Sequence, residues 1–320
     1  MNISLRNSLT VLLLAAASTG VFAESNKVVS PDGRLTVNVV DRDGRLYYDV
    51  LYDGKQMMLE SQLGVVANIG DFSQRLVYRS VSNRKIADDY TMRGTKTSAV
   101  SYRANQMSVV YVNEKKLPMT VTFNVSDNDI AFRYEFGNVN DRTHIIIDKE
   151  ATAFRLPTQT TTFLSPQSDP MIGWKRTKPS YEEEYTPDAP MTAKSKYGQG
   201  YTFPCLFHVG NDGWVLVSET GTHGNYPGCR LSDYSAEQGY SLVFPMTGEC
   251  DGRGAANAAF ALPGATPWRT ITVGSTLKPI VETTVSYDVV KPLYEASEQY
   301  KPGRYTWSWL IWQDNSANYN

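Results

Sequence analysis

Hydrophobic and polar residues alternate along most of this chain, which is the pattern of strands that bury one face. The first two examples run over 35–39 and 46–52, between three Asp-Gly pairs that recur about ten residues apart. Asp-Gly between alternating segments favours a tight hairpin turn, because glycine adopts positive φ without steric cost. The beginning of the chain is therefore predicted to be an antiparallel meander.

Further short segments of the same kind follow, and Gly, Pro and Asp separate them. We expect strands at 107–112, 119–125, 130–136, 144–147, 214–219, 240–244, 258–262 and 270–273. No amphipathic helix of ordinary length is evident before about residue 291. So many short strands in one run predict an all-β fold, a large antiparallel sandwich, rather than a parallel α/β sheet.

The first 23 residues have the composition of an export signal. Arg6 provides a positive start, a short apolar stretch follows, and Ala23 ends a small-residue cleavage site. Residues 1–23 are therefore predicted to be a signal peptide, and the protein to be exported, periplasmic or extracellular. No other segment approaches the roughly 20 apolar residues that cross a bilayer, so we expect no membrane span.

The last residues predict a strand without its partner. Trp307, Trp309 and Trp312 alternate with other residues after a Pro-Gly turn, and such a strand needs a large surface on which to bury its indoles. We interpret it as the start of a second, truncated domain. The expected organisation is a sandwich over 24–288, a linker with a short helix over 289–301, and the second domain over 302–320.

Charge and cysteine content exclude several classes of function. The formal net charge is −2 and no basic run is present, so nucleic acid is not an expected partner. Cys205, Cys229 and Cys250 lack the spacing of a metal site, and their odd number permits at most one internal disulfide. Buried free thiols or a single bridge both remain open. No motif for a nucleophile, a phosphate loop or a dinucleotide is present, so no catalytic residue is nominated.

The densest group of oxygen ligands is formed by Glu182, Glu183 and Glu184, in an irregular stretch at about 157–200. Loops of this length are usually functional or disordered. Neighbouring side chains of an extended backbone point to opposite faces, so at most two of the three carboxylates can share a site. The group is compatible with a solvated acidic loop or with a ligand for Ca²⁺, which prefers carboxylate oxygens.

Six short motifs occur along the chain in a specific order. They are SPDGRL at 30–35, YE at 181–182, FP at 203–204, GWV at 213–215, PGR at 302–304 and WSW at 307–309. Together they resemble the amino-terminal part of glycoside hydrolase family 97, whose members are exported bacterial α-glucosidases and α-galactosidases. The resemblance covers nearly all of the chain after the signal. It implies a β-super-sandwich similar to galactose mutarotase, followed by a (β/α)₈ barrel.

The resemblance also implies roles for particular residues. Glu182 matches a family glutamate that reaches from the sandwich to the barrel and helps to hold Ca²⁺, with Glu183 and Glu184 as alternates because the register is not fixed. Trp309 and Ser308 would face the sugar pocket at the carboxyl end of the first barrel strand. The family's two catalytic carboxylates lie on the barrel, beyond this chain, and such a pair must flank the scissile bond. No catalytic residue is therefore expected here.

The expected function is that of the amino-terminal part of an exported α-glycosidase, which hydrolyses terminal α-glucosidic or α-galactosidic bonds. The chain would supply a calcium ligand and part of the sugar site, and its partner would be a carbohydrate. One alternative is a free-standing carbohydrate-binding sandwich without catalytic activity. Another is a mutarotase-like epimerase, which would need a histidine acid from among His144, His208 and His223.

Overall fold

The computed structural model describes residues 26–92, 95–170, 183–294, 297–298, 301 and 303–306. The predicted signal peptide and three of the predicted site residues, Glu182, Ser308 and Trp309, lie outside these ranges. Of the predicted second domain only 303–306 are described, and they have no regular secondary structure. The predicted domain boundaries therefore stay predictions.

The chain begins with a four-stranded antiparallel sheet in sequential order. Its strands are β1 (Asn26–Val29), β2 (Leu35–Arg42), β3 (Arg45–Tyr52) and β4 (Lys55–Leu63). Asp43 and Gly44 have φ of 53° and 74°, and Asp53 and Gly54 repeat this with 50° and 76°. Positive φ at both central positions matches the twist of a hairpin, which explains the Asp-Gly pairs. The predicted meander is confirmed.

A ten-stranded sheet forms the second layer, and its strands come from distant parts of the chain. In spatial order they are β14 (Ala189–Pro190), β13 (Thr160–Phe163), β16 (Cys205–Val209), β17 (Gly213–Thr220), β22 (Trp268–Gly274), β10 (Asp129–Phe136), β9 (Pro118–Val125), β8 (Ala99–Val112) and β7 (Val77–Thr91), with β21 (Gly264–Ala265) beside β10. All of its pairings are antiparallel.

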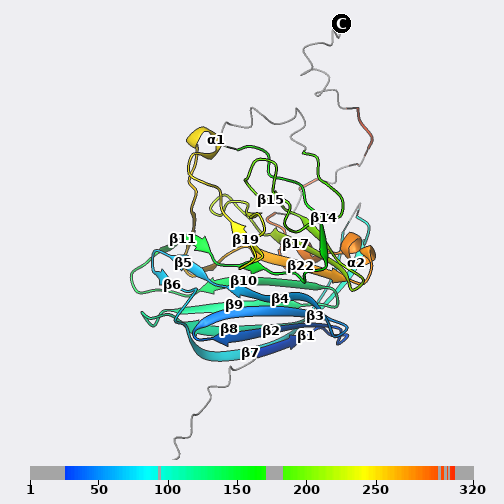
Figure 1. The fold of residues 1–320 in the computed structure, drawn as a ribbon. Helices are drawn as coiled ribbons and strands as arrows, with labels where there is room; N and C mark the ends of the chain where they lie inside the picture. The colour runs from blue at the N-terminus through cyan, green and yellow to red at the C-terminus, as the bar shows by residue number, and fades with distance from the viewer. Residues whose placement is uncertain are drawn as a thin grey trace, which may run out of the picture.

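Aromatic side chains join the two layers. Tyr48 on β3 lies with its ring centroid 5.3 Å from that of Phe132 on β10 and 6.3 Å from that of Phe123 on β9. All three residues are fully buried. Figure 1 shows β1–β4 beside β8–β10 in one half of the molecule and the irregular loops around β14, β15 and α1 in the other. The predicted antiparallel β-sandwich is confirmed.

Two small sheets and three short helices complete the described structure. One sheet contains β20 (Ala258–Ala261), β11 (His144–Glu150), β5 (Val65–Ala67) and β6 (Gly70–Asp71). The other contains β12 (Ala153–Phe154), β19 (Tyr240–Val243), β18 (Arg230–Leu231) and β15 (Tyr201–Thr202). The helices are α1 (Glu249–Gly252), α2 (Leu277–Glu282) and α3 (Val285–Asp288). No helix in the described part of the chain is long and apolar enough to cross a membrane.

Two sequence expectations need correction. The helix expected in the linker is absent from the described residues of 289–301, and α2 and α3 precede that segment. The hydroxyl of Thr276 caps α2 by accepting from the backbone N–H of Lys278 at 3.3 Å. A threonine at this position favours the start of a helix, but it comes shortly after the predicted strand at 270–273, and the helix was not predicted. The stretch at 157–200 is also not wholly irregular, because β13 and β14 lie within it and pair with each other.

Candidate functional site

The acidic loop enters the described structure at Glu183. Its side chain is 1 % exposed and accepts hydrogen bonds from Lys196 Nζ at 2.7 Å and from the hydroxyl of Tyr197 at 3.3 Å. The ammonium group of Lys196 also lies 5.1 Å from the centroid of the Tyr197 ring. This pairing raises the pKa of Lys196, because the charged ammonium is stabilised. The carboxylate of Glu183 is thus neutralised within the sandwich.

The next residue faces a different environment. Glu184 is exposed and, with Tyr185, lines a hollow of about 380 Å³. Lys194, Ser195 and Lys196 add polar groups to its lining. A wall of amines and hydroxyls beside an aromatic ring can bind a polyhydroxylated ligand through hydrogen bonds. We refer to this hollow as the loop pocket.

A metal site is not assembled by the described residues alone. In the ranges given above, no group of three or more Asp, Glu, His or Cys side chains could hold an ion. Glu182 itself lies outside those ranges, so the calcium role expected for it stays a prediction. Glu183 is a poor candidate for the calcium ligand, because its carboxylate already forms an ion pair with Lys196.

A second ionic cluster lies deep in the sandwich, and the sequence analysis did not identify it. The guanidinium of Arg269 on β22 is fully buried and pairs with Glu150 at the end of β11 and with Glu219 on β17. Its Nε donates to Glu150 at 3.2 Å, while its two terminal nitrogens donate to Glu150 and Glu219. The cluster carries two carboxylates and one cation.

Neutral donors satisfy the remaining lone pairs of the cluster. The hydroxyl of Tyr226 donates to Glu150, the hydroxyl of Thr152 donates to Glu150 at 3.2 Å, and the backbone N–H of Cys229 donates to Glu219 at 2.8 Å. Burial raises the pKa of Glu219, and Arg269 opposes that shift. Burial alone would lower the pKa of Arg269, but Glu150 holds it well above its ordinary value. Such a network ties three strands together and is closed to substrate.

Charged residues on a strand that is otherwise apolar are the signal that could have revealed this cluster. Every residue of β22 is buried, so its one arginine needs carboxylate partners from neighbouring strands. Glu219 is its direct neighbour in the register of β17 and β22. The position of Glu150, which is 119 residues away in sequence, follows only from the fold.

Two cysteines, Cys205 and Cys229, and the three histidines lie at separate places in the described structure. Cys205 and Cys229 are free and buried, and burial raises the pKa of both thiols. His144 and His223 are exposed, whereas His208 stacks on Trp214 with a ring-centroid distance of 4.1 Å. The three imidazoles come from separate strands and loops and do not share a pocket that the described residues line.

Comparison with known families gives one match over most of the chain. The sequence model described as "Glycosyl-hydrolase 97 N-terminal" matches residues 28–292. Among curated proteins, a retaining alpha-galactosidase of Bacteroides thetaiotaomicron is 23% identical over 337 aligned residues. That match covers 96% of this chain and 47% of the relative.

Solved structures agree with this match. A beta-arabinopyranosidase is 54% identical, with a TM-score of 0.86, and the match covers 91% of this chain and 46% of that protein. A family 97 enzyme from Pseudoalteromonas sp. strain K8, in complex with panose, has a TM-score of 0.66 at 20% identity, which shows the fold alone. That match covers 83% of this chain and 38% of the enzyme. The chain thus spans about half the length of the relatives that it matches.

Proposed function

The chain belongs to glycoside hydrolase family 97, and from that premise we propose that it supplies the amino-terminal domain of an exported enzyme that hydrolyses terminal glycosidic bonds. The family match over residues 28–292 carries this proposal. Support also comes from the two relatives described above, which are glycosidases and contain this domain as about half of their length.

The proposed substrate is a terminal β-L-arabinopyranoside or α-D-galactoside. The relative that is 54% identical is a beta-arabinopyranosidase, and the curated relative is an alpha-galactosidase. The two sugars are stereochemically related, because a β-L-arabinopyranoside has the ring configuration of an α-D-galactoside without its hydroxymethyl group. An α-glucoside, the other substrate expected from the sequence, differs at C4, and the relative in complex with panose is 20% identical and bears on the fold alone.

The catalytic carboxylates are proposed to lie outside this sequence. Hydrolysis needs two carboxyl groups on opposite sides of the scissile bond, about 5 Å apart for retention or about 6.5–9.5 Å apart for inversion. Among the described residues, Glu150 and Glu219 are both bound to Arg269, and Glu183 is bound to Lys196. None of these carboxylates can take part in such a pair without breaking its ion pair.

The sandwich would contribute to the sugar site from the acidic loop. We assign the calcium ligand to Glu182 in preference to Glu183, because Lys196 already neutralises Glu183. Glu184 remains an alternate, since it is exposed beside the loop pocket. We also propose, from the family resemblance, that Trp309 and Ser308 face the sugar. When bound, Ca²⁺ would supply a positive charge that polarises the glycosidic oxygen or a nucleophilic water.

A hydrolysis assay on the 320-residue chain tests this division of roles. The chain should release no nitrophenol from 4-nitrophenyl β-L-arabinopyranoside, α-D-galactopyranoside or α-D-glucopyranoside. Turnover above the buffer rate that survives repurification would place a catalytic pair within this sequence. Saturable binding of galactose without turnover would favour the alternative of a free-standing carbohydrate-binding sandwich, provided that no catalytic domain is encoded after Asn320.

A further inference from the structure

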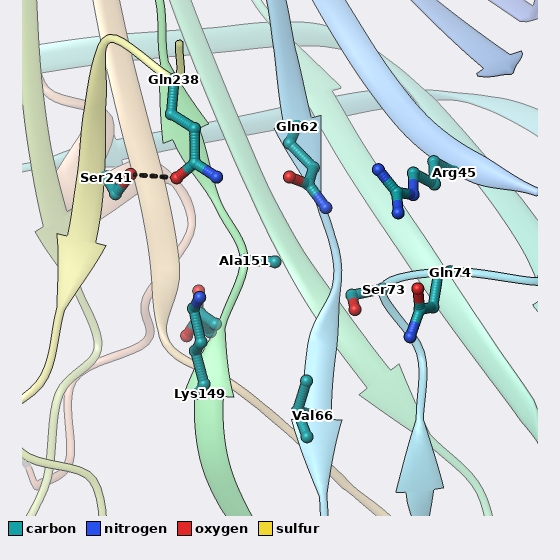
Figure 2. Close-up of a pocket in the computed structure, with 10 residues that line it drawn as sticks. Arg45, Gln62, Val66, Ser73, Gln74, Lys149, Ala151, Gln238 and Ser241 are labelled. Atoms are coloured by element: carbon teal, nitrogen blue, oxygen red, sulfur yellow. Dashed lines mark hydrogen bonds between the residues drawn. The ribbon is translucent and has the colours of Figure 1, made fainter. Parts of the chain in front are cut away.

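A polar hollow of about 230 Å³ lies on the sandwich, and it shares no lining residue with the loop pocket. Strands β3, β4, β5, β11 and β19 contribute to it, together with the segments that follow β6 and β11 and the segment that leads into β19. Its lining residues are Arg45, Gln62, Val66, Ser73, Gln74, Lys149, Glu150, Ala151, Gln238 and Ser241. In Figure 2 the labelled residues, which come from several strands and from the segments that connect them, surround the small side chain of Ala151.

The charge of this hollow is positive. Among the described residues, neither Arg45 nor Lys149 forms an ion pair, whereas the nearby Arg42 and Arg75 are each paired with a glutamate. Glu150 is not available to pair with Arg45 or Lys149, because it is 1 % exposed and both of its oxygens are bound from within the sandwich. The two cations therefore face an open volume without a compensating carboxylate in the lining.

One carboxylate lies close behind the lining. Asp71 accepts from the hydroxyl of Ser73 at 2.6 Å and from the side-chain amide of Gln74 at 2.8 Å. These bonds hold both side chains at the edge of the hollow and use the oxygens of Asp71 internally. Asp71 therefore positions the lining more than it neutralises Arg45 or Lys149.

The rest of the lining is made of neutral hydrogen-bonding groups. The side-chain amide of Gln62, which lies opposite Tyr47 in the β3–β4 pair, forms no hydrogen bond with another described residue, although Gln62 is only partly exposed. Gln238 accepts from the hydroxyl of Ser241 at 3.1 Å, which leaves its amide nitrogen available as a donor. In Figure 2 the amides of Gln62 and Gln238 extend toward the space between the strands. Amides and hydroxyls in this arrangement match the hydroxyls of a sugar ring.

We infer that this hollow binds an anionic sugar unit, a uronic acid residue of a polysaccharide. Its carboxylate would pair with Arg45 or with Lys149, which Figure 2 shows on opposite sides of the hollow, and its hydroxyls would bond to Gln62 and Gln238. Pockets for drug-sized ligands are about 300–1,000 Å³, so a hollow of this size suits one sugar ring. The site lies apart from the hydrolytic function proposed above, and its test does not depend on that function.

The test is a saturation-transfer difference NMR titration of the full chain with D-galacturonate and D-galactose as separate probes, and with inorganic phosphate, which has no carbon-bound protons, as a competitor. D-Galacturonate should bind with saturation, and added salt should weaken the binding. At least one of Arg45→Gln and Lys149→Gln should lower the affinity for D-galacturonate about tenfold, because it removes the charge-assisted contact to the carboxylate. An unchanged affinity in both variants would contradict the inference. Arg75→Gln is the matched control, since it removes the same charge beside the hollow from a residue outside the lining, and it should bind as the parent does.

Three further results would overturn the inference. Equal affinities for D-galactose and D-galacturonate would show that the carboxylate of the sugar does not contribute to binding. Inorganic phosphate that displaces D-galacturonate at equal concentration would show a plain anion site. If the folded parent chain gives no saturable signal with D-galacturonate, the hollow does not bind this sugar. Thermal unfolding of the parent and of each variant checks that all of them are folded.

Discussion

Arg269→Met tests the buried ion network most sharply. The substitution keeps an apolar side chain of similar length but leaves Glu150, which is fully buried, and Glu219, which is 10 % exposed, without their shared cation. Removing one partner of a buried pair costs about 3–5 kcal/mol. Because two carboxylates lose the same partner, the loss of unfolding free energy should lie at the upper end of that range.

A second substitution should reverse part of this loss. In Glu150→Gln/Arg269→Met the more deeply buried carboxylate becomes a neutral amide, whose oxygen can accept from one of the hydroxyls of Tyr226 and Thr152 and whose nitrogen can donate to the other. The double variant should therefore recover about 1–3 kcal/mol relative to Arg269→Met. The single variant should also gain stability on acidification, since carboxylates with raised pKa bind protons in the folded state that the unfolded state has released.

Urea unfolding followed by circular dichroism measures these differences, provided that the slope against urea concentration is unchanged. Arg42→Met is the matched control, because Arg42 is 54 % exposed in its pair with Glu60 and such surface pairs contribute about 0–1 kcal/mol. The reasoning would be refuted if Arg269→Met cost no more than Arg42→Met. It would also be refuted if the double variant were less stable than Arg269→Met.

Three further predictions concern other parts of the domain. Burial raises the pKa of Asp129 to about 6, although two threonine hydroxyls bind and stabilise its charged form. Between about pH 4 and pH 6 the folded state therefore holds a proton that the unfolded state has lost, and the free energy of unfolding should fall by about 2–3 kcal/mol as the pH rises through this range. In urea titrations, Asp129→Asn should abolish this dependence on pH. Gly200→Ala would place a Cβ atom 1.9 Å from a backbone carbonyl oxygen of β18, at a φ of +82°. The control is Gly54→Ala, whose Cβ would meet nothing within 4 Å at a similar φ of +76°. Gly200→Ala should therefore lower the unfolding temperature far more than Gly54→Ala. Glu182→Gln should weaken Ca²⁺ binding to the product of the whole reading frame in calorimetry, whereas Glu183→Gln should not; equal effects would remove the distinction drawn from Lys196.

Strands with one buried face could be predicted from the sequence, and strands without one could not. The alternation in β2 and β3 marks inward residues such as Val37 and Val50, and both strands form as expected. In contrast, β7 (Val77–Thr91) is exposed or only partly buried along its whole length, so its sequence has no apolar stripe. It forms because the backbone of β8 pairs with it at the edge of the sheet.

The site was predictable only in part, for a physical reason. A run of three glutamates is visible in the sequence, but the commitment of Glu183 to Lys196 depends on how the loop folds. Arg269 and Glu150 meet through strands that are far apart in the chain, so no local pattern links them. The polar hollow is likewise built from five strands and loops, each of which contributes one or two ordinary surface residues.

The most direct test of the proposed function is the specificity of the protein expressed from its whole open reading frame. We would measure kcat/KM for 4-nitrophenyl β-L-arabinopyranoside, α-D-galactopyranoside and α-D-glucopyranoside under identical conditions. The account predicts hydrolysis of the first two substrates, with the glucoside at least about 100-fold slower, because a site that bonds the C4 hydroxyl in one configuration rejects the other. A preference for the glucoside, or no hydrolysis by a protein that carries a barrel with its carboxylates, would contradict it.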